Sequence, residues 1–190
     1  MTAEWVTAIA TAGTFVVIAG SAIAALAQIR HLRSSNQIAA LNECRETIQS
    51  PDFQAAEQFV LDLAPRLSDP AVQSALLEDF IAKEYAPMRM IANFFENMGV
   101  FVKNGIIDRE IACDLWQGVV LRNWDAIAPI AINRRVALHI EPLWENFEYL
   151  ATVCKQWAEE HPHGGYPRGA RRMPHPDLWP LVREAEQRNT

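Results

Sequence analysis

The stretch NFFENMGVFVKNGIIDRE, from Asn93 to Glu110, decides the fold predicted for this chain. Its apolar residues recur every three or four positions, which is the period of one face of an α-helix. Asn104 and Gly105 predict where this helix ends, because glycine readily adopts the left-handed conformation that closes a helix. Asp108 predicts the start of another helix as its N-terminal cap. The expected core face of the first helix contains Ile91, Phe94, Phe95, Met98, Phe101 and Val102.

The opposite face of this helix carries Arg89, Asn93 and Glu96, spaced so that their side chains can meet. We consider two interpretations, a polar network or small-ligand site and a solvated face with local pairs. The second is favoured because Glu and Arg are rarely buried. Gly99 lies within the predicted helix, where glycine costs ~1 kcal/mol relative to alanine, and so predicts a close helix crossing. Residues from later helices that could join the network are Arg134, Arg135, Glu145 and Asn146.

The same helical periodicity extends through residues 51–160, and strand alternation is missing. Ser50-Pro51 and Asp69-Pro70 each place a capping residue before proline, a signal for a helix start. Residues 71–85 are expected to form one helix and residues 124–135 a separate short one, bent or begun near Pro129. A last long helix is expected from about Pro142. The prediction is an all-α fold with a compact antiparallel helical bundle over residues 51–160.

Residues 5–29 contain no charged side chain and predict a single transmembrane helix. At ~1.5 Å per residue, 25 residues span about 37 Å, enough for a hydrocarbon core of ~30 Å. A secretory signal would carry basic residues before the apolar run, but only Glu4 is charged there. A soluble core helix would carry a polar stripe, and this segment has none. Residues 1–4 are expected to be a short external segment. Residues 30–50 are expected to continue the span as a juxtamembrane helix.

The flanks of the span predict its orientation. Arg30, His31 and Arg33 directly follow the apolar run, and basic residues favour the cytoplasmic side. We therefore expect the N-terminus outside and the bundle in the cytoplasm. Small residues on one face of the span predict a helix-helix contact with a second copy or another membrane protein, unless they reflect only how common Ala and Gly are in spans. This face consists of Ala10, Gly13, Val17, Gly20, Ala24 and Ala27.

From His161 the composition changes to glycine, proline and arginine, which predicts an extended arm over residues 161–190 that ends in a short helix. Folding back onto the bundle is the favoured interpretation of its apolar anchors, and docking onto a partner is the alternative. The arm residues that could dock on a partner or touch anionic headgroups are Arg168, Arg171, Arg172, Leu178, Trp179, Leu181 and Val182.

Composition and motifs exclude several functions. The formal net charge is −6, with −8 on the first 160 residues, which is a poor match for nucleic acid. No catalytic or metal-binding motif occurs, so no catalytic residue, metal or cofactor is predicted. The widely spaced Cys44, Cys113 and Cys154 are expected to be buried thiols in a reducing compartment, with Cys44 the most exposed.

The order of a span, a basic stop, RMIANFFENMGVFVKNGIIDREIACDLW, NW, RR and LWENFEYL resembles a bacterial family of small membrane-anchored helical proteins. That family is known only as a domain of unknown function. The resemblance covers about Phe53 to Leu150 and is strongest from Asn93 to Trp116. It implies a bacterial source and a cytoplasmic helical domain, and it transfers no activity to any residue.

Two functional hypotheses follow. The first is a non-enzymatic protein-interaction module tethered to the bacterial inner membrane, serving as an accessory or scaffold subunit of a membrane complex. Its expected partners are other membrane proteins, or a second copy, and the lipid bilayer. The alternative is a membrane-anchored sensor or effector that binds a small ligand, of unknown identity, near Arg89, Asn93 and Glu96.

Overall fold

The computed structural model describes residues 3–167, 169–174 and 179, with side chains throughout this part except at residues 4–10, 30, 33 and 34. The described part contains helices, turns and loops and no β-strand, which confirms the all-α prediction. Two short 3-10 helices lie at Ala64–Ser68 and Lys83–Tyr85. The α-helices are α1 (Ala3–Gln49), α2 (Pro51–Leu63), α3 (Pro70–Glu78), α4 (Ala86–Lys103), α5 (Arg109–Leu138) and α6 (Glu145–Glu160).

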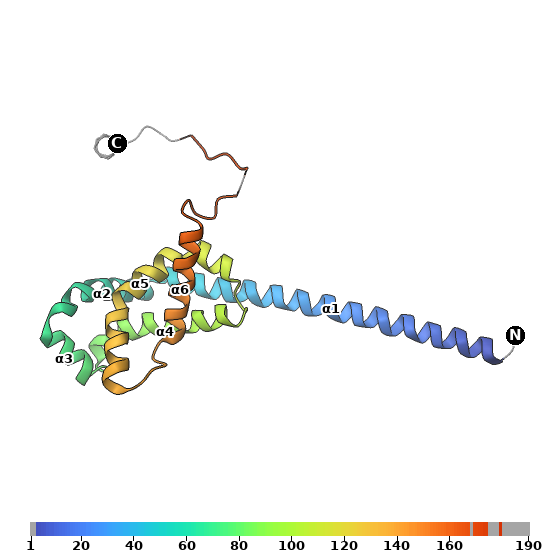
Figure 1. Ribbon diagram of the computed structural model, residues 1–190, viewed down its shortest axis with the longest axis horizontal. Helices are drawn as coiled ribbons and strands as arrows, with labels where there is room; N and C mark the ends of the chain where they lie inside the picture. Colours follow the sequence, from blue (N-terminus) through green and yellow to red (C-terminus); the bar gives the residue numbers. More distant parts are fainter. Residues whose placement is uncertain (1–2, 168, 175–178, 180–190) are drawn as a thin grey trace.

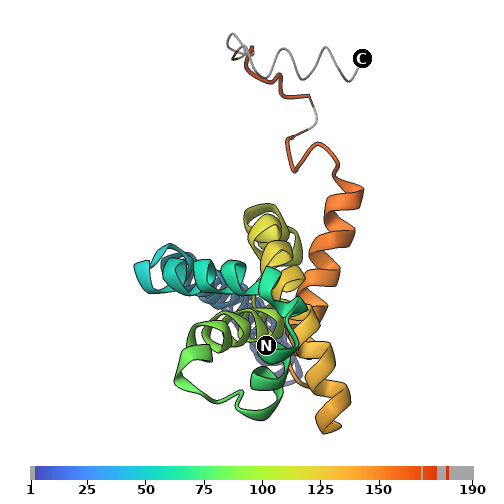
Figure 2. The ribbon, with the colours of Figure 1, turned by 90° about the vertical axis from the view of Figure 1, so that its left-hand side faces the viewer.

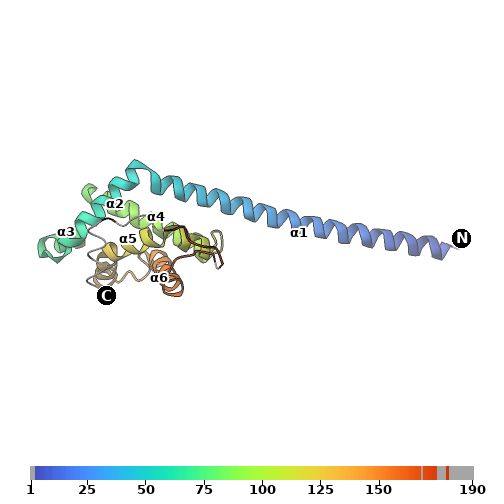
Figure 3. The same ribbon diagram turned by 90° about the horizontal axis from the view of Figure 1, so that it is seen from above.

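The longest element, α1, projects from the rest of the molecule as a single helix (Figures 1 and 3). Its 47 residues extend about 70 Å at ~1.5 Å per residue. Only its C-terminal turns reach the body, where Ala40, Leu41 and Ile48 pack against the core. The predicted continuation of the apolar segment as one helix into residues 30–49 is therefore confirmed. The ten residues between Ile29 and Ala40 form a stalk of about 15 Å.

The remaining helices form a compact bundle in which α4 contacts α2, α5 and α6 (Figure 2). Aromatic rings connect these helices through the core. Phe95 of α4 stacks on Phe147 of α6 at 4.9 Å between ring centroids, and Trp124 of α5 meets Phe147 edge-on at 5.0 Å. Phe53 of α2 closes the cluster against Phe95 at 6.0 Å. Aromatic pairs in these geometries add to the free energy gained by burying their area.

The predicted helix starts are confirmed by their hydrogen bonds. Ser50 Oγ accepts from the backbone N–H of Phe53 at 3.2 Å, and Asp69 caps α3 in the same manner. Asp108 Oδ1 accepts from the N–H of Ile111 at 3.1 Å at the start of α5. Gly105 has a φ of +66°, as expected for the corner between α4 and α5. Local capping chemistry therefore fixes these boundaries.

Two predicted boundaries are wrong because tertiary contacts override local signals. No separate short helix begins near Pro129, since α5 continues through it to Leu138. Proline removes one helical hydrogen bond, but the buried Ile127 and Ile130 on either side hold both halves against the core. The segment 71–85 is not one helix, because α3 ends at Glu78 and Arg134 donates to the terminal carbonyl of Leu76 at 2.7 Å.

One further expectation, on the start of the last helix, is corrected, and the expectation for the thiols is confirmed. The last helix begins at Glu145 rather than near Pro142, after Trp144 adopts a left-handed φ of +54°. All three thiols are buried, as expected, and Cys44 is the most exposed of them at only 4%, because it lies among the C-terminal turns of α1 that pack on the body. Burial and the neighbouring Glu43 carboxylate raise the pKa of Cys44 to about 11.

Gly99 lies at a close crossing of α4 and α6, as predicted. A Cβ atom built on Gly99 would lie 2.6 Å from the backbone carbonyl carbon of Asn146. Only a residue without a side chain allows the backbones of the two helices to approach this closely. The crossing brings the start of α6 beside the polar face of α4.

Candidate functional site

The apolar segment of α1 is uncovered where its side chains are described. Residues Thr11–Ile29 have a mean hydropathy of 1.9, and none of this segment is buried. Phe15, Ile23 and Leu26 have exposed fractions of 72%, 69% and 62%. Because none of it is buried, this segment is not a core helix of the described bundle. The segment is long and apolar enough to cross a membrane, and a signal sequence near the N-terminus shares these properties.

The predicted small-residue face is open to solvent. A Cβ atom built on Gly13 or Gly20 would meet no other atom within 4 Å. Val17, Ala24 and Ala27 are likewise exposed, and the side chain of Ala10 lies outside the described residues. This face of α1 therefore leaves room for the close approach of another helix, as the sequence pattern requires.

The three polar residues predicted to meet on α4 instead bind three different segments. Arg89 donates to the backbone carbonyls of Phe80 at 2.5 Å and Ala82 at 3.0 Å, in the loop after α3. Asn93 Oδ1 accepts from the indole N–H of Trp144 at 2.9 Å. These contacts fasten the segments that flank α4, and they leave Arg89 and Asn93 without a bond to each other. Asn93 is exposed and Arg89 is half-buried, as a partly solvated face requires, but their hydrogen-bond partners lie on other segments instead of on α4.

Glu96 closes the N-terminus of α6 from a different helix. Its Oε2 accepts from the backbone N–H groups of Asn146 at 3.0 Å and Phe147 at 2.9 Å. Its Oε1 accepts from the side-chain amide of Asn146 at 2.6 Å. Trp144, at the capping position of α6, makes no side-chain cap bond. Glu96 therefore does what an N-cap residue normally does, and its negative charge also faces the positive end of the helix dipole.

Only one of the four residues expected to join this cluster does so. Asn146 bonds Glu96 and also accepts from Lys103 Nζ at 3.1 Å. Arg134 binds the end of α3, and Arg135 donates to the carbonyl of Leu143 and pairs with Glu148. Glu145 makes no contact with Glu96 among the described hydrogen bonds. Spacing within one helix could not show that the partner of Glu96 would be the start of another helix.

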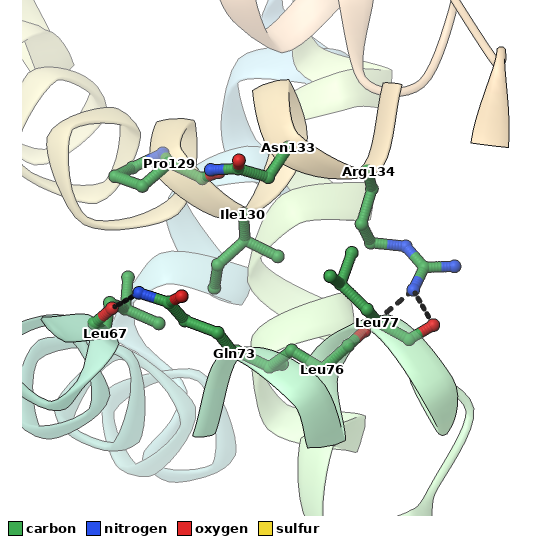
Figure 4. Close-up of a pocket in the computed structure, with 8 residues that line it drawn as sticks. All are labelled: Leu67, Gln73, Leu76, Leu77, Pro129, Ile130, Asn133 and Arg134. Atoms are coloured by element: carbon green, nitrogen blue, oxygen red, sulfur yellow. Dashed lines mark hydrogen bonds between the residues drawn. The ribbon is translucent and has the colours of Figure 1, made fainter. Parts of the chain in front are cut away.

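A pocket of about 130 Å³ lies between α3 and α5 (Figure 4). Figure 4 shows Ile130 extending from α5 toward Leu76 and Leu77 of α3, while Arg134 reaches the carbonyls of both leucines. Gln73 is held by a bond from its amide nitrogen to the carbonyl of Leu67 at 2.7 Å. The sequence did not indicate this site, which is apolar at its centre and polar at its rim. Its volume suits a single side chain or small ring.

A second groove of about 180 Å³ separates the end of α1 from α4. Phe94, Met98 and Phe101 form its apolar wall, and Cys44 and Thr47 face them from α1. The groove lies where the stalk joins the bundle. Because it separates α1 from α4 there, α1 contacts the body mainly through α2.

The described part of the arm leaves the end of α6, passes close to Asp114 of α5 at Gly165, and then extends away from the bundle (Figure 1). Residues 162–167 and 169–174 are exposed. Arg172 lies over the ring of Tyr166 at 4.7 Å and donates to the carbonyl of His163 at 2.6 Å. Tyr166 donates to the carbonyl of Arg171 at 3.1 Å, and Trp179 is 80% exposed. The predicted docking residues Arg168, Leu178, Leu181 and Val182 lie outside the described residues.

In the described part of the chain, no three His, Cys, Asp or Glu side chains gather where they could hold a metal ion. Residues 15–157 match the protein family described as Domain of unknown function (DUF4760). The chain belongs to this family. The DUF4760 region begins within the apolar segment of α1, includes the whole bundle as far as Trp157 in α6, and stops before the arm. No curated protein and no solved structure matches the chain.

The family match confirms the resemblance to a domain of unknown function and extends it. The expected overlap, about Phe53 to Leu150, lies entirely within residues 15–157. The stalk and much of the apolar segment are therefore part of the DUF4760 region, together with the bundle. The arm after His161 lies outside the match, as the sequence predicted.

Proposed function

We propose that this protein is a non-enzymatic helical interaction module, tethered to a bacterial inner membrane by α1. Its role would be that of an accessory or scaffold subunit of a membrane protein complex. The observation that carries the proposal is the uncovered apolar segment Thr11–Ile29, continuous with a rigid helix that ends in the bundle. Uncovered apolar side chains on every face of a helix are stable in lipid and unfavourable in water.

The proposed orientation places the N-terminus outside and the bundle in the cytoplasm. The basic residues after the apolar segment support this orientation through the positive-inside rule. The stalk would then hold the acidic bundle about 15 Å from the membrane surface. Two surfaces would be available to protein partners, the small-residue face of α1 within the membrane and the arm beyond it.

Membrane tethering is tested by placing charge in the apolar segment. Replacing Ile18 and Ile23 together by arginine is expected to move most of the protein from the membrane fraction to the soluble or degraded fraction. Each central arginine costs ~2.5–3.5 kcal/mol in a membrane-inserted helix. The measurement is the share of full-length chain that stays in membranes after an alkaline carbonate wash. Leu32→Arg is the matched control, because Leu32 lies on the stalk and is 60% exposed.

Three outcomes would contradict the tether. They are recovery of the unaltered chain in the soluble fraction, equal effects of the control and double variants, and loss of N-terminal residues from the expected mass of 21.4 kDa. The last outcome would identify the apolar segment as a cleaved signal sequence. A C-terminal fluorescent reporter that folds only in the cytoplasm tests the orientation, and an absence of fluorescence in a membrane-inserted fusion would reverse it.

The arm is tested through Trp179. Trp179→Ala is expected to leave the midpoint of thermal unfolding nearly unchanged, because the side chain is 80% exposed. The same change is expected to reduce crosslinking to partner proteins in membranes several-fold, because exposed tryptophans often dominate interfaces. Tyr149→Ala, on exposed surface of α6, serves as the control for crosslinking. An unaltered crosslinking pattern would remove the arm from the proposed interface.

We do not place a small ligand at Arg89, Asn93 and Glu96. Each of the three side chains binds a neighbouring segment of the same chain. These hydrogen bonds hold neighbouring segments of the bundle in place, which gives all three side chains a structural role. The interaction proposal therefore rests on the surfaces of α1 and the arm, away from this cluster.

A further inference from the structure

Two of the three cysteines meet inside the bundle. Cys113 of α5 and Cys154 of α6 are 41 positions apart in the chain, and their sulfur atoms lie 3.5 Å from each other. Both residues have 0% exposure, and both are free thiols. The third thiol, Cys44, belongs to α1 and lines the groove against α4. The chain therefore carries one thiol pair and one separate thiol that serves as an internal reference.

The geometry of the pair is suited to a covalent link. A disulfide has a sulfur–sulfur bond of about 2.05 Å, so the two atoms must approach by about 1.5 Å. The hydrogen bond from Cys154 lowers the pKa of Cys113 despite its burial. The hydrogen bond with Cys113 and burial raise the pKa of Cys154. Cys113 is therefore the thiol that ionises first, and Cys154 is positioned to react with it.

We propose that Cys113 and Cys154 form a redox-active dithiol, which hydrogen peroxide converts into an intramolecular disulfide between α5 and α6. In the first step the Cys113 thiolate attacks a peroxide oxygen, the O–O bond breaks, and a sulfenic acid and hydroxide form. In the second step the Cys154 sulfur attacks the Cys113 sulfur, the S–O bond breaks, and water leaves with the thiol proton. Two thiols are oxidised and one peroxide is reduced to two waters.

The disulfide would lock the part of α6 that leads into the arm. The N-terminus of α6 is held by Glu96, and near its C-terminal end the Trp157 indole N–H donates to Glu110 of α5 at 2.8 Å. Cys154 lies one turn before Trp157, so a link there would fasten this half of α6 to α5 covalently. Oxidation would thereby restrict local opening at the base of the arm. Hydrogen peroxide would reach the buried sulfurs of the reduced protein during this transient local opening.

The test uses the full-length, reduced protein in detergent, treated with hydrogen peroxide, then denatured and alkylated. The unaltered chain is expected to lose two of its three alkylated thiols and about two mass units, without added oxygen. Peptide mapping is expected to find Cys113 joined to Cys154, with Cys44 alkylated. The midpoint of thermal unfolding should rise by roughly 5–10 °C and return after reduction.

Matched variants identify the pair. Cys44→Ala is expected to retain the internal disulfide, whereas Cys113→Ala and Cys154→Ala are expected to lose it. Three alkylated thiols, under peroxide that fully oxidises a cysteine peptide, would overturn the proposal. So would oxygen added to single cysteines, or disulfides through Cys44. These outcomes are measured on the unaltered chain, so they remain decisive even if a core variant does not fold.

Discussion

Gly99→Ala is expected to destabilise the bundle by roughly 2 kcal/mol or more, although alanine is the better helix former. At an ordinary helix position this substitution gains up to ~1 kcal/mol. At Gly99 the new Cβ would lie 2.6 Å from the carbonyl carbon of Asn146 and would overlap its oxygen. The obstacle is backbone, which a rotamer change cannot move, so α6 must shift away from α4. That shift would also disturb the bonds between Glu96 and the start of α6.

The measurement is the midpoint of thermal unfolding in detergent, which is expected to fall by about 5 °C or more. Gly118→Ala is the matched control, because Gly118 lies in α5 with nothing within 4 Å of a Cβ atom built on it. This control is expected to be neutral or slightly stabilising. Equal shifts at the two glycines would show that the close crossing of α4 and α6 does not set the stability.

Glu96→Ala is the second large change, with an expected loss of ~2–3 kcal/mol in the free energy of unfolding. The substitution removes the acceptor for the backbone N–H groups of Asn146 and Phe147. These donors begin α6, and Trp144 offers no capping side chain in place of Glu96. Hydrogen bonds to a charged group are stronger than neutral ones, and the helix dipole strengthens them further. Thermal unfolding measures the loss.

Glu96→Gln separates the charge from the hydrogen bonds. The amide keeps one acceptor oxygen and loses the charge, so we expect about half the loss seen with alanine. Asn97→Ala, at an exposed neighbouring position of α4, is the control and should change the free energy by less than ~0.5 kcal/mol. Hydrogen exchange should show faster exchange at Asn146 and Phe147 in the Glu96 variants alone. If α6 keeps its protection in Glu96→Ala, the capping role is wrong.

The helix starts could be predicted because their causes are local. Ser50, Asp69 and Asp108 each bond a backbone N–H two or three residues ahead, and Gly105 supplies the left-handed residue at the corner. Each signal operates within one helical turn, so it can be recognised without knowing the rest of the fold. The apolar segment is equally local, because its length and lack of charge are properties of consecutive residues.

The errors have the opposite cause. Pro129 normally predicts a break, but α5 continues because residues on both sides of it are buried in the same core. The end of α3 coincides with a bond from Arg134, 58 positions away from Leu76. In each case an interaction distant in sequence outweighs a local preference of a few kcal/mol.

The candidate sites also divide into features that could be predicted from one helix and features that depend on distant segments. The sequence identified Arg89, Asn93 and Glu96 as one cluster, because they share a helix face. It missed Trp144 as a partner and the pocket between α3 and α5, since both require segments about 50 or more positions apart to meet. The signal available for Glu96 was the unusual Gly99 one turn later, which predicted a close crossing without naming the second helix.

The sequence by itself therefore determined the all-α class, the capped starts of α2, α3 and α5, and the apolar segment of α1, which is long enough to cross a membrane. The tertiary structure alone decided that Glu96 caps α6, that Gly99 faces Asn146, and that Cys113 meets Cys154. The physical reason is range. Helical period and capping depend on atoms within a few residues, whereas these three contacts join positions more than 40 residues apart and exist only once the bundle has packed.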